Sequence, residues 1–185
     1  MNLVSRVKGI LTNPRQEWAV IDGEPVNIPA LLTGYVLPLA AIGPIATAIG
    51  WSMFGMGGFF RMSAGYAVSY AITMFVMSIV AVFVCAWVIN MLAPTFGATQ
   101  SMPQAIKVAA YSFTAAWVAA IFNLIPALVL LAAIGGLYSL YLLYLGLPLL
   151  MKASPEKAMS YTIVVIIVMI IVYIVAGYVA RGVAF

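Results

Sequence analysis

Five long apolar runs, separated by short polar segments, dominate the hydrophobic pattern of this chain. They cover roughly residues 30–53, 64–92, 105–122, 126–147 and 159–180. An apolar helix of about 20 residues crosses the ~30 Å hydrocarbon core of a bilayer, so each run can span it, the third only just. Asn123 and Pro126 can end the third helix and start the fourth, which predicts a tight antiparallel hairpin. The pattern predicts an all-α polytopic membrane protein, a compact bundle of five transmembrane helices over residues 29–185.

Residues 1–28 lie outside these runs and predict short helices at the membrane interface. In the first helix, Ser5, Arg6 and Lys8 lie toward the polar face, which is expected to face water. The apolar residues of the same helix share the other face, and they are Leu3, Val4, Val7, Ile10 and Leu11.

A second short helix is predicted to follow at once. Asn13 is a suitable N-cap, Pro14 suits the first helical position, and Gln16 stands where a capping box places its partner. Trp18 is expected at the depth of the lipid headgroups. The stretch DGEPVNIP, residues 22–29, should break this helix and lead into the first span.

Composition agrees with a membrane protein and excludes several classes of function. Hydrophobic residues make up 66% and charged residues 6% of the chain, far from the average of soluble proteins. The few Lys and Arg are scattered, which argues against a nucleic-acid surface. Histidine is absent and Cys85 is the single cysteine, so a serine–histidine hydrolase site and an internal disulfide are excluded. We expect no cofactor and no enzymatic activity.

The positions of Lys and Arg predict the orientation, because short cytoplasmic loops are enriched in these residues. An N-terminus on the cytoplasmic side places Arg61 and Arg181 on the far side and the C-terminus in the periplasm or outside the cell. The residues then expected on the cytoplasmic side are Arg6, Lys8, Arg15, Lys107, Lys152 and Lys157. With this assignment no ionisable group lies at membrane depth, where proton-coupled pumps and voltage sensors need one.

Tyrosines gather in the stretch GLYSLYLLYLGLPLLMKASPEKAMSYT, residues 136–162. Tyr138, Tyr141 and Tyr144 recur every three residues, which makes a slanted stripe on a helix, and Tyr161 follows the next loop. Tyr138 lies about 9 Å deeper than Tyr144, so its hydroxyl must find a partner inside the bundle. Two interpretations stay open: hydrogen bonds between helices, or a stripe that binds a ligand or partner.

The loop within this stretch is the most featured polar segment between spans. Membrane topology alone explains its charges, but a protein or an anionic lipid could also contact them. The candidate contacts for a partner or ligand are Tyr111, Ser112, Tyr138, Tyr141, Tyr144, Lys152, Glu156, Lys157 and Tyr161.

Three carboxylates, Glu17, Asp22 and Glu24, lie close together in sequence before the first span. Such oxygen ligands suit a hard divalent cation, although their spacing matches no calcium loop, and solvated surface charge is the alternative. Small residues four apart, such as Ala46 and Gly50, allow close helix packing, either within one bundle or in a homo-oligomer.

The run AAYSFTAAWVAAIFNLIP and the tyrosine-rich stretch resemble the Yip1 domain family in its short bacterial form, from about Leu11 to Ala180. The resemblance implies five spans, a cytoplasmic N-terminus and, for a bacterial form, the inner membrane. Eukaryotic relatives are linked to Golgi and endoplasmic reticulum traffic and to Rab GTPases, a role that does not carry over directly. Where many relatives have a proline after the Tyr-Ser pair, this chain has Ala115 and Ala116, which puts a kink of the third span in doubt.

Two functions remain open. The first is a non-enzymatic membrane protein that organises the membrane or binds a partner. It predicts a closed, dry core and loss of function on substitution in the N-terminal helices or at Lys152, Glu156 and Lys157. The second is a small transporter or channel for a neutral solute, lipid or divalent cation. It requires that Tyr138, Tyr141 and Ser112 line a hydrated cavity.

Overall fold

A computed structural model describes residues 2–55 and 63–183 of this chain, and the part described is built from helices. Arg61, and the side chain of Arg181, lie outside the described residues. Five helical segments are long and apolar enough to cross a membrane. They are Ile28–Phe54, Ala64–Phe96, Met102–Leu124, Pro126–Leu150 and Pro155–Val172. The all-α, five-span prediction is confirmed.

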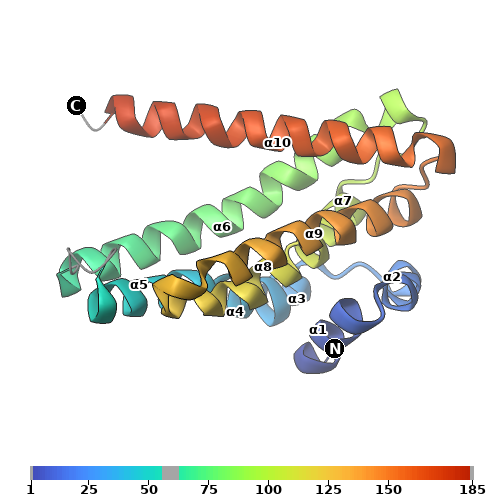
Figure 1. Cartoon of the computed structure of the whole chain (residues 1–185). Helices are drawn as coiled ribbons and strands as arrows, with labels where there is room; N and C mark the ends of the chain where they lie inside the picture. The colour runs from blue at the N-terminus through green and yellow to red at the C-terminus, as the bar shows by residue number, and fades with distance from the viewer. Residues whose placement is uncertain (1, 56–62, 184–185) are drawn as a thin grey trace.

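Several spans are assembled from shorter pieces (Figure 1). The first consists of α3 (Ile28–Leu31), the π-helical turn η1 (Leu32–Val36), α4 (Leu37–Ala40) and α5 (Ile42–Phe54). The second consists of α6 (Ala64–Leu92) and η2 (Ala93–Phe96), and the fifth is α10 (Pro155–Val183). The third consists of α7 (Met102–Ser112), α8 (Thr114–Ala119) and η3 (Ala120–Leu124), and the fourth of η4 (Pro126–Leu128) and α9 (Val129–Leu150).

The third and fourth spans form the predicted antiparallel hairpin, joined through Ile125. Small residues let these helices approach closely. A Cβ atom added at Gly135 of α9 would lie 2.1 Å from the Cβ of Ala119 in α8. The third span is also the most buried of the five, so it lies at the centre of the bundle.

The third span is interrupted at Phe113 even though no proline is present there. The Thr114 hydroxyl donates to the carbonyl of Tyr111 at 2.7 Å and shares a second 2.7 Å hydrogen bond with the Tyr35 hydroxyl. Threonine can bend a helix by bonding a carbonyl of the preceding turn. A break therefore occurs at this point, where it is accompanied by a hydroxyl network and not by a proline.

Two short helices, α1 (Leu3–Thr12) and α2 (Pro14–Gly23), precede the first span. The predicted polar and apolar faces of α1 are partly wrong, because Arg6 is 6% exposed whereas Val4 is 74% exposed. Arg6 is buried because acidic side chains farther along the chain bind it. Ser5 and Lys8 are exposed as predicted.

The second helix begins at Pro14 as predicted, but the capping box does not form. The Asn13 side chain makes no bond to the backbone of α2, and its Nδ2 donates to Oε1 of Gln16 at 2.5 Å. Trp18 is 1% exposed instead of facing lipid headgroups. It packs so closely on Gly146 of α9 that a Cβ atom there would lie 2.5 Å from the indole ring.

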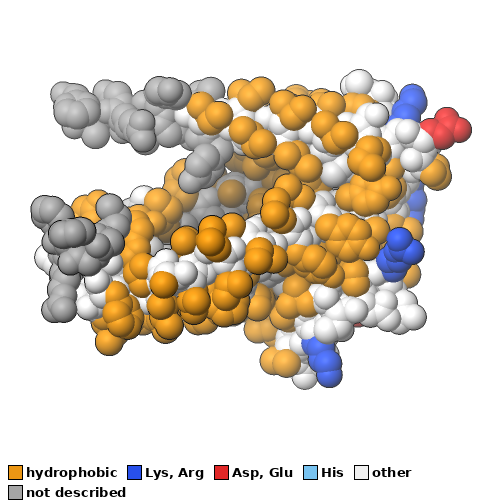
Figure 2. Space-filling model, viewed as in Figure 1, with side chains coloured by type: hydrophobic (Ala, Val, Ile, Leu, Met, Phe, Trp, Pro, Cys, Tyr) orange, Lys and Arg blue, Asp and Glu red, His pale blue; other side chains and the backbone are white. Residues whose placement is uncertain are grey.

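Charged side chains gather at one end of the bundle, while hydrophobic side chains cover the rest of the face shown in Figure 2. We call this the charged end; it comprises α1, α2, residues 97–101 and residues 151–157. The backbone N–H of Thr99 donates to the Met151 carbonyl at 2.7 Å, which joins the two loops. The last turns of α10 lie at the opposite end of the bundle (Figure 1).

Candidate functional site

The charged end is organised around Arg6, which reaches from α1 to two carboxylates. Its guanidinium lies 2.5 Å from Oε1 of Glu17 in α2 and also binds Glu24, the residue after α2. It stands 5.7 Å from the ring centroid of Tyr111, within the range of a cation–π contact. Burial lowers the pKa of Arg6, but the Glu24 hydrogen bond and the neighbouring charges outweigh it and raise the pKa overall. Arg6 is therefore a permanent buried cation.

Tyr111 and Ser112, both predicted contact residues, lie inside the bundle. The Tyr111 ring packs edge-on against Trp18, with centroids 6.1 Å apart, and against Tyr35 at 4.8 Å. Ser112 is buried, and its Oγ has no hydrogen-bond partner among the described residues. Both side chains are buried, and Tyr111 also lines a cavity beside α3 and α7.

Lys107, predicted on the cytoplasmic side, is buried next to the charged end and does not face water. Only 4% of it is exposed, and its Nζ donates to the backbone carbonyl of Glu24 at 3.0 Å. The segment after α2 folds back over α7, which removes the ammonium from water. No carboxylate of the described residues makes an ion pair with Lys107.

Of the predicted tyrosine stripe, the rings of Tyr138 and Tyr141 lie in contact, with centroids 5.6 Å apart, but the tyrosines have different surroundings. The Tyr138 hydroxyl donates to the Leu11 carbonyl of α1 at 3.0 Å, so its partner comes from the N-terminal segment. Tyr141 is exposed on the outside of the bundle, and Tyr144 is half-buried. The Tyr161 hydroxyl binds a carbonyl of α6, and its ring stacks on Phe96 at 4.9 Å.

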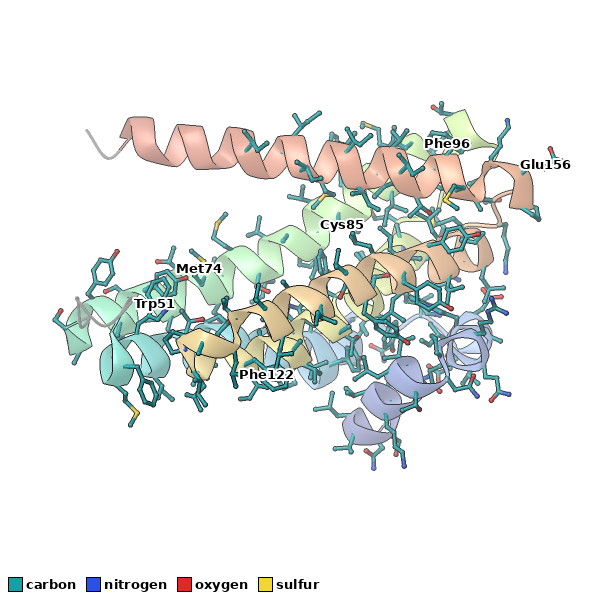
Figure 3. All side chains as sticks on the ribbon, viewed as in Figure 1. Trp51, Met74, Cys85, Phe96, Phe122 and Glu156 are labelled. Carbon is teal, nitrogen blue, oxygen red and sulfur yellow. The ribbon has the colours of Figure 1, made fainter. Side chains whose placement is uncertain are left out.

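The loop residues Lys152, Glu156 and Lys157 are all exposed, and Glu156 extends away from the bundle (Figure 3). Lys152 pairs with Asp22 of α2 at 2.7 Å. The loop is held by a backbone bond from Ala153 to the Pro148 carbonyl at 3.1 Å as well as by the link to residue 99.

A groove beside this loop separates α2 from α9 and the start of α10. Its volume is about 480 Å³. Apolar side chains form most of its wall, including Trp18 and Pro148, while Arg15 and Tyr144 supply polar groups. We call it the α2–α9 groove. Sequence reasoning missed it, because Arg15 and Tyr144 are 129 positions apart and no local pattern connects them.

The three carboxylates considered for a metal do not converge. Glu17 and Glu24 bind Arg6, whereas Asp22 binds Lys152. No group of three His, Cys, Asp or Glu side chains in the described ranges could hold a metal ion. The acidic group serves to hold the N-terminal helices in place.

Comparison with known proteins identifies the family. The Yip1 domain family model matches residues 8–176. The chain is similar to the inner membrane protein YohC of Escherichia coli K12 and of strain O6:H1, with 29% identity over 167 residues, 86% of this chain and 85% of each relative. No solved structure matches the chain significantly. This chain is a multi-pass membrane protein that belongs to the Yip1 domain family.

Proposed function

We propose that this protein is a non-enzymatic scaffold of the bacterial inner membrane that binds a protein partner at its charged end. The partner would place an apolar side chain in the α2–α9 groove and acidic residues beside Arg15, Lys152 and Lys157. The observation that carries this proposal is the groove itself, an apolar recess bordered by exposed cations on an ordered loop.

The contacts of the polar side chains in the spans support a scaffold and argue against a transporter. A transport path needs hydrated polar groups inside the bundle. Tyr138 instead bonds a backbone carbonyl and lines a groove whose other walls are apolar, Tyr141 is exposed on the outside, and Ser112 is buried. The three positions required for transport therefore do not converge on one polar cavity, which supports the scaffold.

The backbone of the loop adds a second argument. Lys152 has φ of 55°, the left-handed region that costs a non-glycine residue about 1 kcal/mol. Backbone strain of this kind tends to be found where a side chain has a function. The Lys152 side chain is 57% exposed despite the Asp22 contact, so its ammonium can also bind a partner's carboxylate.

The proposal includes the orientation, with the charged end in the cytoplasm. Five of the Lys and Arg whose side chains are described lie at that end, namely Arg6, Lys8, Arg15, Lys152 and Lys157, and the sixth, Lys107 of α7, lies next to it and bonds the Glu24 carbonyl. Positive residues near span ends are retained in the cytoplasm. A membrane-impermeant thiol reagent should therefore label a cysteine at position 156 only after the cells are opened.

Site-specific photocrosslinking in bacterial cells tests the partner. A photoreactive amino acid at Glu156 or Lys157 should give a discrete crosslinked protein, identified by mass spectrometry. The same group at Leu137, an exposed apolar position in the span, should not. Arg15→Gln combined with Lys152→Asn should abolish the product. Asparagine tolerates the left-handed backbone, so the fold should be kept.

Two outcomes would overturn the proposal. One is a crosslinking pattern that is unchanged by Arg15→Gln with Lys152→Asn. The other is solute flux into proteoliposomes that is lost on Tyr138→Phe or Ser112→Ala while the thermal midpoint stays constant, which would favour the transporter.

A further inference from the structure

A second cavity at the charged end lies on the other side of α2, between the segment after α2, α3 and α7. It has a volume of about 560 Å³, and Glu24, Asn27, Gly34, Lys107 and Tyr111 are among the residues that line it. We call it the α3–α7 cleft. The first and third spans both begin here (Figure 1), so in a bilayer the cleft lies near the lipid headgroups.

Lys107 is a buried cation in this cleft whose bonding is incomplete. An ammonium has three N–H donors, and the structure accounts for one of them, the 3.0 Å bond to the Glu24 carbonyl. A desolvated charge is costly unless other groups compensate it. Glu17 and Glu24 bind Arg6 instead, and Asp22, the other nearby carboxylate, binds Lys152. Lys107 therefore has room for an anionic group from outside the chain.

Glu24 supplies the opposite charge in the same cleft. Its Oε1 binds Arg6, and its side chain is 38% exposed. Oε2 has no bonding partner among the described residues, so this oxygen can accept a hydrogen bond from an ammonium. The cleft thus offers a donor cation and an acceptor carboxylate next to each other.

One wall of the cleft is open toward the outside of the bundle. Ala30, Thr33 and Gly34 line it and are exposed. A Cβ atom added at Gly34 would meet nothing within 4 Å. An acyl chain attached to a headgroup in the cleft could leave past these small residues into the bilayer.

From these features we propose that the α3–α7 cleft binds the headgroup of a phospholipid that carries a primary amine, of the ethanolamine type. Its phosphate accepts from the Lys107 ammonium, and its own ammonium donates to the Glu24 carboxylate. The charges favour a zwitterion over a simple anion, because the cations near the cleft balance the carboxylates: Arg6, Lys107 and Lys152 against Glu17, Asp22 and Glu24. This site does not depend on the protein partner proposed above.

Lipid titration followed by native mass spectrometry tests the site on the full chain in detergent. The probes are dioctanoyl phosphatidylethanolamine, phosphatidylglycerol and phosphatidylcholine, with free phosphoethanolamine as a fourth arm. Phosphatidylethanolamine should bind at least about tenfold tighter than phosphatidylglycerol, which lacks the amine, and than phosphatidylcholine, whose ammonium has no N–H to donate. Binding of free phosphoethanolamine as tight as that of the lipid would overturn a lipid site.

Two variants locate the binding. Lys107→Met should weaken phosphatidylethanolamine by about tenfold or more, the cost of losing a charge-assisted hydrogen bond. Gly34→Leu leaves every charge in place and fills open space, so it should block the lipid without lowering the thermal midpoint. Lys8→Gln removes an exposed cation outside the cleft and should change nothing. Unchanged phosphatidylethanolamine affinity in both cleft variants, or equal affinity for phosphatidylglycerol, would overturn the proposal.

Discussion

Replacement of Arg6 by methionine tests how the N-terminal helices are held. Arg6→Met removes a guanidinium that is 6% exposed and leaves Glu17 and Glu24 together without a counter-charge. Loss of one partner from a buried ion pair costs about 3–5 kcal/mol. The carboxylates are 21% and 38% exposed and so partly hydrated. We therefore expect a smaller cost of about 2–3 kcal/mol.

Hydrogen–deuterium exchange measures this cost helix by helix. The substitution should lower the stability of α1 and α2 against local opening and leave that of the bundle unchanged. Opening of these two helices should become roughly 30- to 150-fold more frequent, which is what about 2–3 kcal/mol means at 25 °C. Amides of α9 should keep their protection, since the α8–α9 packing does not involve Arg6.

The controls separate charge from packing. Lys8→Met changes an exposed residue of the same helix and should leave exchange unaltered. Arg6→Met combined with Glu17→Gln and Glu24→Gln removes the whole ion network, and neutral replacement of such a network is often close to energetically neutral. Exchange in this triple variant should return to within about 1 kcal/mol of the original chain. If the triple variant opens as readily as Arg6→Met alone, unpaired carboxylates are not the cause, and the reasoning fails.

Four further substitutions test packing, each followed by the thermal unfolding midpoint in detergent. Gly146→Ala should destabilise by about 1–3 kcal/mol because its Cβ would meet the Trp18 ring at 2.5 Å, whereas Gly136→Ala, with nothing within 4 Å, should be neutral or stabilising. Tyr161→Phe should cost about 1 kcal/mol, since it keeps the stacked ring and loses one buried hydrogen bond; an unchanged midpoint would contradict that bond. Ser112→Ala should cost nothing, because its hydroxyl has no partner in the described part, and a clear loss of stability would reveal one.

The spans could be predicted from the sequence because the bilayer imposes a simple rule on length and polarity. Each of the five predicted runs overlaps a span of the structure. The hairpin at Asn123 and Pro126 could also be predicted, since two membrane-spanning helices joined by a short connection must run antiparallel. The break at Phe113 could not be predicted, because it accompanies a hydrogen bond between the hydroxyls of Tyr35 and Thr114, which belong to two different spans.

The candidate site was harder to predict, because its contacts join residues that local patterns cannot connect. Helical periodicity assigned Arg6 to the water-facing side, whereas its position follows from Glu17 and Glu24, 11 and 18 residues away. Trp18 was assigned to the interface by its residue type, yet the absence of a side chain at Gly146 gives it a buried place. One signal was present in the sequence: the N-terminal segment carries acidic residues as well as Arg6, which indicates that these opposite charges pair with each other.

Two polar side chains of the spans bond backbone carbonyls of the N-terminal segment. Tyr138 donates to the carbonyl of Leu11, in the last turn of α1, and Lys107 donates to the carbonyl of Glu24, the residue after α2. The last carbonyls of a helix lack partners within it and carry partial negative charge. The Tyr138 hydroxyl therefore helps to cap the end of α1, and the Lys107 ammonium holds the chain directly after α2. Helices of about ten residues are only marginally stable alone, so contacts with the bundle stabilise α1 and α2. The α2–α9 groove and the α3–α7 cleft are bounded by α2 and the segment after it, so their shapes depend on these contacts as well.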